Sequence, residues 1–433
     1  MHTKPLRLHI TTLGCSKNIF DSERLAAALG GRYRLSHSTE LASADIVILN
    51  TCGFIDQAKR ESVKAILEYA EAKQRGLIQR LYVIGCLVAR DKATLQAELP
   101  EVDGFYTQSE YEKLILDLQG NLRNFLLGER QRLGYPHHAY LKISEGCNRK
   151  CSFCAIPLMR GKHVSRPMET ILAEARLLIA QGVKEISLIA QDLTFYGIDL
   201  YGKRRLAPLL EALSALEGIG WIRLHYAYPA GFPREILSVI RDAPPICKYL
   251  DMPLQHISDR ILRQMRRGLS ASHTKALLET IRTQVPSIAL RSTFIVGFPG
   301  ETEREFEELL QFLEEYRIER VGAFLYSHEE GTTAHALYSD DVPLKVKKRR
   351  YHELMKLQQQ ISYEWNQSWI GQTIQVLVDE VKEGVAVGRT QYDAMEVDNL
   401  VYVSDPTGQT APGKFVQARV VDATEYDLWA ELV

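Results

Sequence analysis

Long apolar runs and an excess of charge are both missing from this 433-residue sequence. No apolar run reaches the roughly 18 residues that a membrane-spanning helix needs, so we expect no membrane association. Residues 1–5 are not followed by a long apolar core, and we therefore expect no signal peptide. The formal net charge of -1 argues against binding nucleic acid through overall positive charge and leaves only a local basic patch open.

A disulfide framework is missing too. The seven cysteines are an odd number, and their spacing is not that of a small secreted disulfide scaffold. We therefore expect a cytoplasmic protein whose thiols stay reduced and available for metal. A hydrophobic content of 45% and a charged content of 25% are ordinary for a globular protein, and the length predicts two or three domains.

Three of the cysteines, Cys147, Cys151 and Cys154, lie close together after the apolar segment 139–143. Thiolates are soft ligands that suit zinc or iron-sulfur clusters. A structural zinc site would need a fourth ligand, and no second short Cys or His pair follows. Three thiolates on a four-iron cluster leave one iron open for a substrate or cofactor. The Cys-x3-Cys-x2-Cys spacing, with an aromatic residue before the last cysteine, resembles the radical S-adenosylmethionine (SAM) signature; three ordinary buried cysteines would rarely cluster so densely.

The first 120 residues alternate apolar runs with helical patterns, which predicts an open parallel α/β domain. Expected strands at 6–13, 44–49 and 81–84 are followed by Cys15, Cys52 and Cys86, about one β-α-β repeat apart. Because the carboxyl ends of parallel strands share one edge, we expect these thiols to converge there. We interpret them as ligands of a second iron-sulfur cluster, again with one open iron. The alternative is that each cysteine is a small buried hydrophobe.

A helix is expected after the first of these strands, running through Leu25 and Leu29 with its cap at Asp21 or Ser22. A second amphipathic helix is expected over 62–75.

Between 133 and 365, strand-like runs recur with helical stretches such as 168–181 and 301–316 between them. Six such runs predict an incomplete (β/α) barrel whose site lies at the carboxyl ends of its strands. The expected strands are 139–144, 185–190, 221–226, 249–254, 288–296 and 320–326.

Polar residues follow several of these strands. Gln191 and Asp192 follow the second strand and, with Phe153 beside the last signature cysteine, are our candidates for contacts to SAM. The alternative for each polar residue is a structural hydrogen bond at the mouth of the barrel, and His256, after the fourth strand, could cap a helix. Cys247 stands apart from both cysteine sets, and we interpret it as structural.

A run at 345–356 carries six basic residues and one acidic residue. We expect a solvated helix face rather than a nucleic-acid patch.

The last segment, 369–433, shows alternating strands such as 373–378 and 400–403, which predict a small antiparallel β-barrel of the oligonucleotide-binding kind. Its eleven acidic and four basic residues would repel a phosphate backbone and attract a basic protein. A solvated acidic surface without a partner is the alternative. The acidic residues are Asp379, Glu380, Glu383, Asp393, Glu396, Asp398, Asp405, Asp422, Glu425, Asp427 and Glu431.

Over nearly its whole length the sequence resembles the radical SAM methylthiotransferases, and among them the branch that modifies ribosomal protein S-twelve. The sister enzymes that act on transfer RNA typically have Gln-Met in place of Ser16-Lys17. The resemblance rests on five motifs: TLGCSKN (12–18), NTCGFI (50–55), GCL (85–87), PLQHIS (253–258) and GFPGET (297–302).

The resemblance implies three domains: a methylthiotransferase domain (1–121), a radical SAM barrel (133–365) and a TRAM domain (369–433). It implies SAM and two [4Fe-4S] clusters, one on each set of three cysteines. The expected reaction adds a methylthio group to the β-carbon of an aspartate in ribosomal protein S-twelve, free or within the small ribosomal subunit. We expect a monomer that depends on an external electron donor and an external sulfur source.

Two alternatives stay open at this point. One is a transfer RNA 2-methylthioadenosine synthase, which would act on nucleic acid. The other is a non-enzymatic iron-sulfur sensor that binds RNA or ribosomes.

Overall fold

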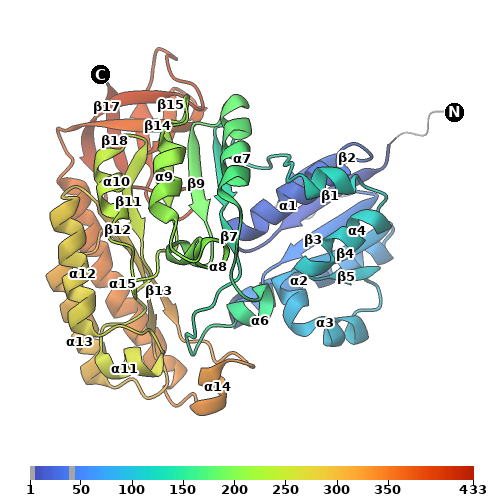
Figure 1. The fold of residues 1–433 in the computed structure, drawn as a ribbon, viewed down its shortest axis with the longest axis horizontal. Helices are drawn as coiled ribbons and strands as arrows, with labels where there is room; N and C mark the ends of the chain where they lie inside the picture. Colours follow the sequence, from blue (N-terminus) through green and yellow to red (C-terminus); the bar gives the residue numbers. More distant parts are fainter. Residues whose placement is uncertain (1–4, 39–43) are drawn as a thin grey trace. The chain divides into compact units, whose positions relative to one another are not determined.

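The computed structural model describes residues 5–38 and 44–433, and the chain divides into two compact units (Figure 1). Unit 1 contains residues 1–134, 145–148 and 154–163, and unit 2 contains residues 135–144, 149–153 and 164–433. The segment that carries the signature cysteines therefore contributes to both units. The predicted domain limits at 1–121, 133–365 and 369–433 stay a prediction.

In the described part of unit 1, a parallel sheet has the strand order β2-β1-β3-β4-β5. This is one of the doubly wound orders, in which the connections reverse direction between β1 and β3. Ligands bind such sheets at this point, beyond the carboxyl ends of the strands. The strands are β1 (Arg7–Thr12), β2 (Arg34–Ser38), β3 (Ile46–Thr51), β4 (Arg80–Gly85) and β5 (Gly104–Tyr106).

Each face of this sheet has its own apolar core, because successive side chains of a strand point to opposite faces. On β3, Ile48 packs in one core with Leu25, and Val47 packs in the other with Ile66. The helices of unit 1 are α1 (Ser16–Leu29), α2 (Asp56–Gln74), α3 (Cys86–Glu98), α4 (Tyr111–Asp117), α5 (Leu122–Leu126), α6 (Ile156–Arg160) and the 3-10 turn η1 (Gln108–Glu110).

The predicted start of the first helix is wrong. Helix α1 begins at Ser16 with Cys15 in the N-cap position, and Asp21 and Ser22 are buried inside the helix. Cys15 has extended backbone and no side-chain cap bond, so ordinary cap chemistry did not mark the start. The polar residues of the first turns face inward instead of capping the helix.

Other differences in unit 1 concern short or shifted elements. Strands β2 and β5 were not expected, since β2 is polar and half exposed and β5 has only three residues. Helix α2 begins at Asp56, earlier than the expected residue 62.

Unit 2 contains a parallel sheet in the order β13-β12-β11-β10-β9-β6, with β6 and β13 at its two edges. The sheet stays open, which confirms the predicted partial barrel. Its strands are β6 (His138–Lys142), β9 (Glu185–Ile189), β10 (Trp221–Leu224), β11 (Ile246–Asp251), β12 (Ala289–Val296) and β13 (Arg320–Leu325). Only β11 lies clearly earlier than expected.

Helices follow the strands of unit 2 and bury one continuous apolar core, which includes Leu188, Leu224 and Phe294. Two short strands, β7 (Ser144–Glu145) and β8 (Val164–Ser165), precede and follow the signature segment in the sequence. The helices are α7 (Met168–Ala180), α8 (Ile198–Tyr201), α9 (Leu206–Ser214), α10 (Ile236–Asp242), α11 (Asp259–Gln264), α12 (Ala271–Gln284), α13 (Glu303–Tyr316), α14 (Thr333–Leu337), α15 (Leu344–Gln367) and the turn η2 (Leu193–Phe195).

The C-terminal strands of unit 2 form a closed barrel in the order β14-β15-β16-β18-β17. Its neighbouring strands are antiparallel except for β16 and β18, which are parallel. The predicted small β-barrel is therefore confirmed. The strands are β14 (Thr373–Lys382), β15 (Val385–Arg389), β16 (Val401–Ser404), β17 (Phe415–Ala423) and β18 (Leu428–Leu432).

Part of the acidic charge of this barrel is buried. The side chains of Asp379, Asp393 and Asp398 pair with arginines, and Asp405 is buried against its own loop. Segment 369–433 is described throughout, and its surface shows seven acidic and three basic side chains. The net charge on the surface of this segment is therefore negative, but it is smaller in magnitude than the net charge counted from the sequence. The arginine partners of the three buried pairs are Arg389, Arg320 and Arg291, in that order.

The basic run in α15 is likewise less solvated than expected. Lys347 and Arg350 are buried and pair with Asp340 and Glu301. Two of the six basic residues therefore hold the helix in place instead of facing water.

Across residues 5–38 and 44–433, no helix combines the length and apolar character needed to cross a membrane.

Candidate metal centres

The three strand-end cysteines lie in contacting segments of unit 1. Cys15 follows β1, Cys52 follows β3 and Cys86 is the first residue of α3 after β4. A Cβ atom on Gly14, whose φ is +94°, would lie 2.9 Å from Cys52 Cβ. A Cβ atom on Gly53 would lie 3.0 Å from the carbonyl carbon of Cys86. The carboxyl ends of β1, β3 and β4 therefore place the three cysteines beside the reversal point of the sheet.

Asn18 ties two of these strand ends together from the first turn of α1. Its Nδ2 donates to Leu13 O at 2.8 Å and to Thr51 O at 3.1 Å. Asn18 is fully buried, and the two backbone acceptors belong to the ends of β1 and β3. The segments before Cys15 and Cys52 are thus held at one spacing by a single side chain.

Cys86 is the most enclosed of the three thiols, at 7% exposure. Arg160 Nε donates to its Sγ at 3.3 Å, and Gln108 Nε2 donates at 3.7 Å. The thiol itself donates to Asn18 Oδ1 at 3.8 Å. Burial raises the pKa of the Cys86 thiol, and the charge of Arg160 only partly opposes this.

Cys52 is held through its backbone. Its N–H donates to Ser62 Oγ at 3.0 Å, and Ser62 Oγ donates to the Cys52 carbonyl at 2.8 Å. Burial raises the pKa of the Cys52 thiol to about 12, although a backbone hydrogen bond from Phe54 lowers it. Since metals bind thiolates, loading of this set must release protons.

The donor chemistry of Cys15, Cys52 and Cys86 fits an iron-sulfur cluster held by three thiolates. In the part of the chain that the structure describes, no three His, Cys, Asp or Glu side chains are spaced to hold a single metal ion. Thiolates that share a cluster bind different irons, so they stand further apart than the ligands of one ion. Cys15 is exposed, which leaves a side of this set accessible.

The signature segment depends on one glycine. Gly146 has φ of +75°, and a Cβ atom there would lie 2.1 Å from Lys162 O. Only glycine fits both the conformation and the space. The next residue, Cys147, donates its N–H to Gly161 O at 3.1 Å, so the start of the segment is fixed by its own continuation in unit 1.

Cys151, the middle signature cysteine, belongs to unit 2. Arg267 Nη1 donates to its Sγ at 3.2 Å, and the Tyr228 hydroxyl lies 3.7 Å from the same atom. The guanidinium groups of Arg149, at 3.9 Å, and of Arg267, at 4.3 Å, both lie over the Tyr228 ring. A cation and a phenol therefore contact this thiol, and a second cation lies over the same ring.

The three SAM candidates have different surroundings. Phe153 packs against an apolar cluster that includes Met265 and Phe298. The buried Asp192 carboxylate accepts hydrogen bonds from Arg149 Nε at 2.7 Å and from Thr194 Oγ1 at 2.6 Å. The Asp192 carboxylate thus holds Thr194 in the segment after β9 and links this segment to Arg149. Gln191 is half buried, and contacts of all three candidates to SAM stay a prediction.

His256 is not a helix cap, because Ser258 occupies the N-cap position of α11. Its Nδ1 accepts the Ser258 N–H at 3.0 Å, and its Nε2 lies 3.5 Å from Glu301. Cys247 is buried in a small apolar cluster with Trp221 and Tyr249, as expected for a structural cysteine.

The residues around the thiols were missed by sequence reasoning. Asn18 lies in the TLGCSKN motif (12–18), so the sequence alone could have pointed to it. Arg160, Gln108, Tyr228 and Arg267 carry no local pattern that would have marked them. They are close to the cysteines only in the folded chain.

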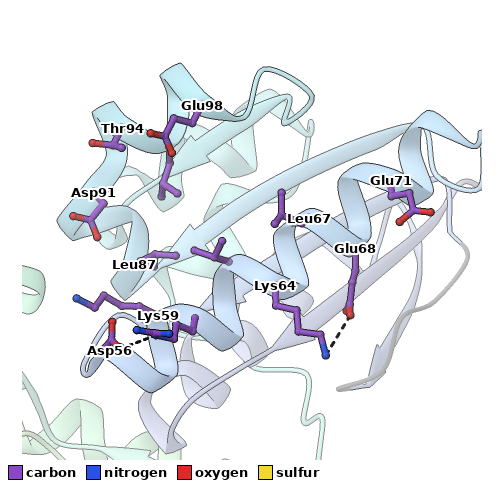
Figure 2. Close-up of a pocket in the computed structure, with 13 residues that line it drawn as sticks. Asp56, Lys59, Lys64, Leu67, Glu68, Glu71, Leu87, Asp91, Thr94 and Glu98 are labelled. Carbon is purple, nitrogen blue, oxygen red and sulfur yellow. Dashed lines mark hydrogen bonds and ion pairs between the residues drawn. The ribbon is translucent and has the colours of Figure 1, made fainter. Parts of the chain in front are cut away.

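A separate groove lies between α2 and α3 of unit 1 (Figure 2). The close-up shows ion pairs along α2, between Asp56 and Arg60 and between Lys64 and Glu68. Leu87 lines the groove as well, but no cysteine does. Its charges are largely self-paired and solvated, so we assign it no chemistry.

Comparisons with known protein families match three separate segments of the chain. Residues 141–313 match the Radical SAM superfamily, residues 370–433 match the TRAM domain, and residues 7–107 match Uncharacterized protein family UPF0004. The chain is thus a radical SAM protein with a TRAM domain, and that superfamily implies a [4Fe-4S] cluster and SAM.

Full-length relatives give the family. The chain is 49% identical to the ribosomal protein uS12 methylthiotransferase RimO of Flavobacterium johnsoniae, covering 100% of both chains. It is 50% identical to the protein of the same name from Porphyromonas gingivalis, covering 99% of both chains. The chain belongs to the RimO family of ribosomal protein uS12 methylthiotransferases.

A solved structure supports the fold. The radical SAM methyltransferase TsrM from Kitasatospora setae, solved with its tryptophan substrate and a SAM analogue, matches with a TM-score of 0.53. The match covers 73% of this chain and 72% of TsrM at 13% identity. At this identity it supports the fold and nothing more.

Proposed function

We propose that this chain is the radical SAM enzyme that methylthiolates ribosomal protein uS12. The observation that carries the proposal is the presence of two separate three-cysteine sets in a chain whose full-length relatives bear that name. One set suits a cluster that starts radical chemistry on SAM. A second set, of the same donor type, suits a cluster that carries the sulfur to be inserted.

The target position we propose is the β-carbon of an aspartate. Its C–H bonds are barely acidic, so acid-base chemistry does not reach them and a cofactor-derived radical is required. SAM with a cluster on Cys147, Cys151 and Cys154 would supply the radical, and a cluster on Cys15, Cys52 and Cys86 would supply the sulfur.

The residues of the chain have positioning roles in this proposal. Arg267 and Tyr228 hold the Cys151 thiolate in unit 2, and Arg160 and Gln108 hold the Cys86 thiolate in unit 1. The barrel keeps water from the reacting carbon. Phe153, Gln191 and Asp192 are the proposed contacts to SAM.

The surface of the terminal barrel supports a protein substrate. Seven acidic side chains against three basic ones favour a basic partner such as a ribosomal protein and disfavour a phosphate backbone. We propose that the chain acts as a monomer on uS12, free or in the small ribosomal subunit, with an external electron donor and sulfur source. Among residues 5–38 and 44–433, nothing favours transfer RNA as the substrate.

Iron content and product mass test the proposal together. After anaerobic reconstitution, the wild type should bind about eight irons per chain, and Cys52→Ala should bind about four. Cys247→Ala, which removes a buried cysteine outside both sets, is the matched control and should keep about eight.

The substrate is tested by mass spectrometry of uS12 after incubation with SAM, a reductant and sulfide as the sulfur source. The wild type should add one SCH2 unit to uS12, and Cys52→Ala should add none. A wild type with only four irons, or the same mass gain on transfer RNA instead of uS12, would contradict the proposal.

A further inference from the structure

A buried arginine contacts the most enclosed thiol of the strand-end set. Arg160 is the last residue of α6, and its side chain is 2% exposed. Its Nε donates to Cys86 Sγ at 3.3 Å, its Nη1 donates to Asp21 Oδ2 at 2.7 Å and its Nη2 donates to Asn18 Oδ1 at 2.6 Å. Each nitrogen of the guanidinium therefore has a different partner, and all of them lie in unit 1.

These contacts fix the direction of the guanidinium. Arginine presents its donors in a rigid planar fork. With Nη1 and Nη2 held by two residues of α1, Nε is left facing the sulfur. Burial lowers the pKa of Arg160, but the charges of Asp21, Cys86 and Glu145 outweigh this and raise it, so the group stays a cation.

A purely structural ion pair would not need this arrangement. The carboxylates of Asp21, at 4% exposure, and of Glu145, which accepts from Nη1 at 3.3 Å, already neutralise the charge of Arg160, and these pairs could close without a thiol. The third nitrogen of the Arg160 guanidinium instead donates to Cys86, and Gln108 is a second donor to the same sulfur. Hydrogen bonds and positive charge at a ligand sulfur favour the more negative, reduced state of a cluster and so raise its reduction potential.

The position of Arg160 in the sequence adds a second point. Helix α6 begins at Ile156, two residues after the last signature cysteine, Cys154, and ends with Arg160. Helices α3 and α6 pack together, and Cys86, Ala155 and Met159 share one apolar cluster. The segment that follows the signature therefore supplies the cation at the strand-end set.

We propose that Arg160 is a positioning residue that holds the Cys86 thiolate and sets the reduction potential of the cluster on Cys15, Cys52 and Cys86. This inference rests on the proposed function, since it requires the second cluster. It adds to that function a residue that tunes the sulfur-carrying site.

The test uses full-length protein in which Cys147, Cys151 and Cys154 are changed to Ala, so that only the strand-end cluster is present. Redox titration followed by electron paramagnetic resonance gives its midpoint potential. We expect the potential to fall in the order Arg, Lys, Met at position 160. Lysine keeps the charge but loses the fork, and methionine loses both.

Two further variants separate tuning from folding. Asp21→Asn combined with Arg160→Met removes both buried charges and should recover stability, but the potential should stay low because the donor to sulfur is still missing. Arg24→Met removes a half-buried arginine of unit 1 that contacts Phe125, and it should leave the potential at the wild-type value.

The outcomes distinguish the two proposals. A cluster that loads normally in Arg160→Met and titrates at the unchanged potential overturns the role of Arg160 and leaves the proposed function intact. If the protein with Cys147, Cys151 and Cys154 changed to Ala binds no iron while Arg160 is in place, both proposals are overturned. Loss of iron from a folded Arg160→Met protein supports the proposal, because Cys86 is then no longer held.

Discussion

The two cysteine sets of this chain have the same donor atoms but are assembled in opposite ways. Cys147, Cys151 and Cys154 are neighbours in one short segment, whereas Cys15, Cys52 and Cys86 come from the ends of three strands. An arginine donates to one thiol in each set, Arg160 to Cys86 at 3.3 Å and Arg267 to Cys151 at 3.2 Å.

The supports of these two arginines differ. Arg160 is held by the buried carboxylate of Asp21 inside unit 1. Arg267 lies over the ring of Tyr228 inside unit 2. A cation beside a thiol is thus fixed by charge pairing in one set and by stacking on an aromatic ring in the other. We expect the strand-end set to depend more strongly on the fold of its unit.

The largest expected effect separates the two sets by their products. Cys151→Ala should abolish formation of 5′-deoxyadenosine, and Cys52→Ala should keep this activity while losing transfer of the methylthio group. The reason is that the proposed function assigns reductive cleavage of SAM to the signature set alone. Chromatography of the nucleoside product measures the first activity, and mass spectrometry of uS12 measures the second. Loss of SAM cleavage in a folded, four-iron Cys52→Ala protein would mean that the sets are not independent.

The next effect concerns the buried charge beside the strand-end set. Asp21→Ala leaves the buried Arg160 cation with only the more exposed Glu145 as a carboxylate partner, and we expect a loss of about 3 kcal/mol in the free energy of unfolding. Urea unfolding of the metal-free protein measures this loss. Asp192→Ala removes the carboxylate partner of Arg149, whose side chain is 19% exposed, and should cost less. Equal losses for the two variants would contradict the difference drawn between the sets.

A smaller effect appears in acid and involves the strand that leads into the signature. Burial lowers the pKa of His138 to about 3, from an ordinary value of 6.5, although Glu185 raises it in part. Below pH 6.5 the unfolded chain takes up a proton that the folded chain does not. The free energy of unfolding should therefore fall as the pH drops, by at most about 1.4 kcal/mol per unit.

Urea unfolding of the metal-free protein at pH 7, 6 and 5 checks this slope. His138→Gln should flatten it. His9→Gln, on the strand that leads to Cys15, should also flatten it, because burial and the nearby His37 lower the pKa of His9. An identical slope in wild type and His138→Gln would rule out His138 as the source.

The smallest effect concerns the cysteine outside both sets. Cys247→Ala should lower the free energy of unfolding by about 1 kcal/mol, because it leaves a small cavity beside Trp221 and Tyr249. Iron content and product formation should equal those of the wild type. A drop in bound iron would show that Cys247 takes part in a cluster.

Sequence reasoning located most strands of the two parallel sheets. The six strands of the partial barrel were predicted within a few residues because short, nearly continuous apolar runs mark buried parallel strands. Strand β2 was missed because its sequence, Arg34–Ser38, is mostly polar and only half buried. The start of α1 was misplaced because Cys15, which is not an ordinary cap residue, occupies the N-cap.

Charge was harder to read than pattern. The eleven acidic residues of the terminal segment include Asp379, whose carboxylate is buried against Arg389. Arg389 in turn pairs with Glu185 of β9, far away in the sequence. A count along the chain includes such charges as if they faced water, since it contains no information about their partners.

The sequence by itself determined the signature set, because thiols separated by only three and two intervening residues can reach one cluster whatever the rest of the chain does. It also determined that Cys15, Cys52 and Cys86 follow strands, since apolar runs precede each of them. Only the tertiary structure decided what surrounds the sulfur atoms. Arg160 reaches Cys86 across a separation of 74 residues, and such a contact depends on how α3 and α6 pack and on no local pattern.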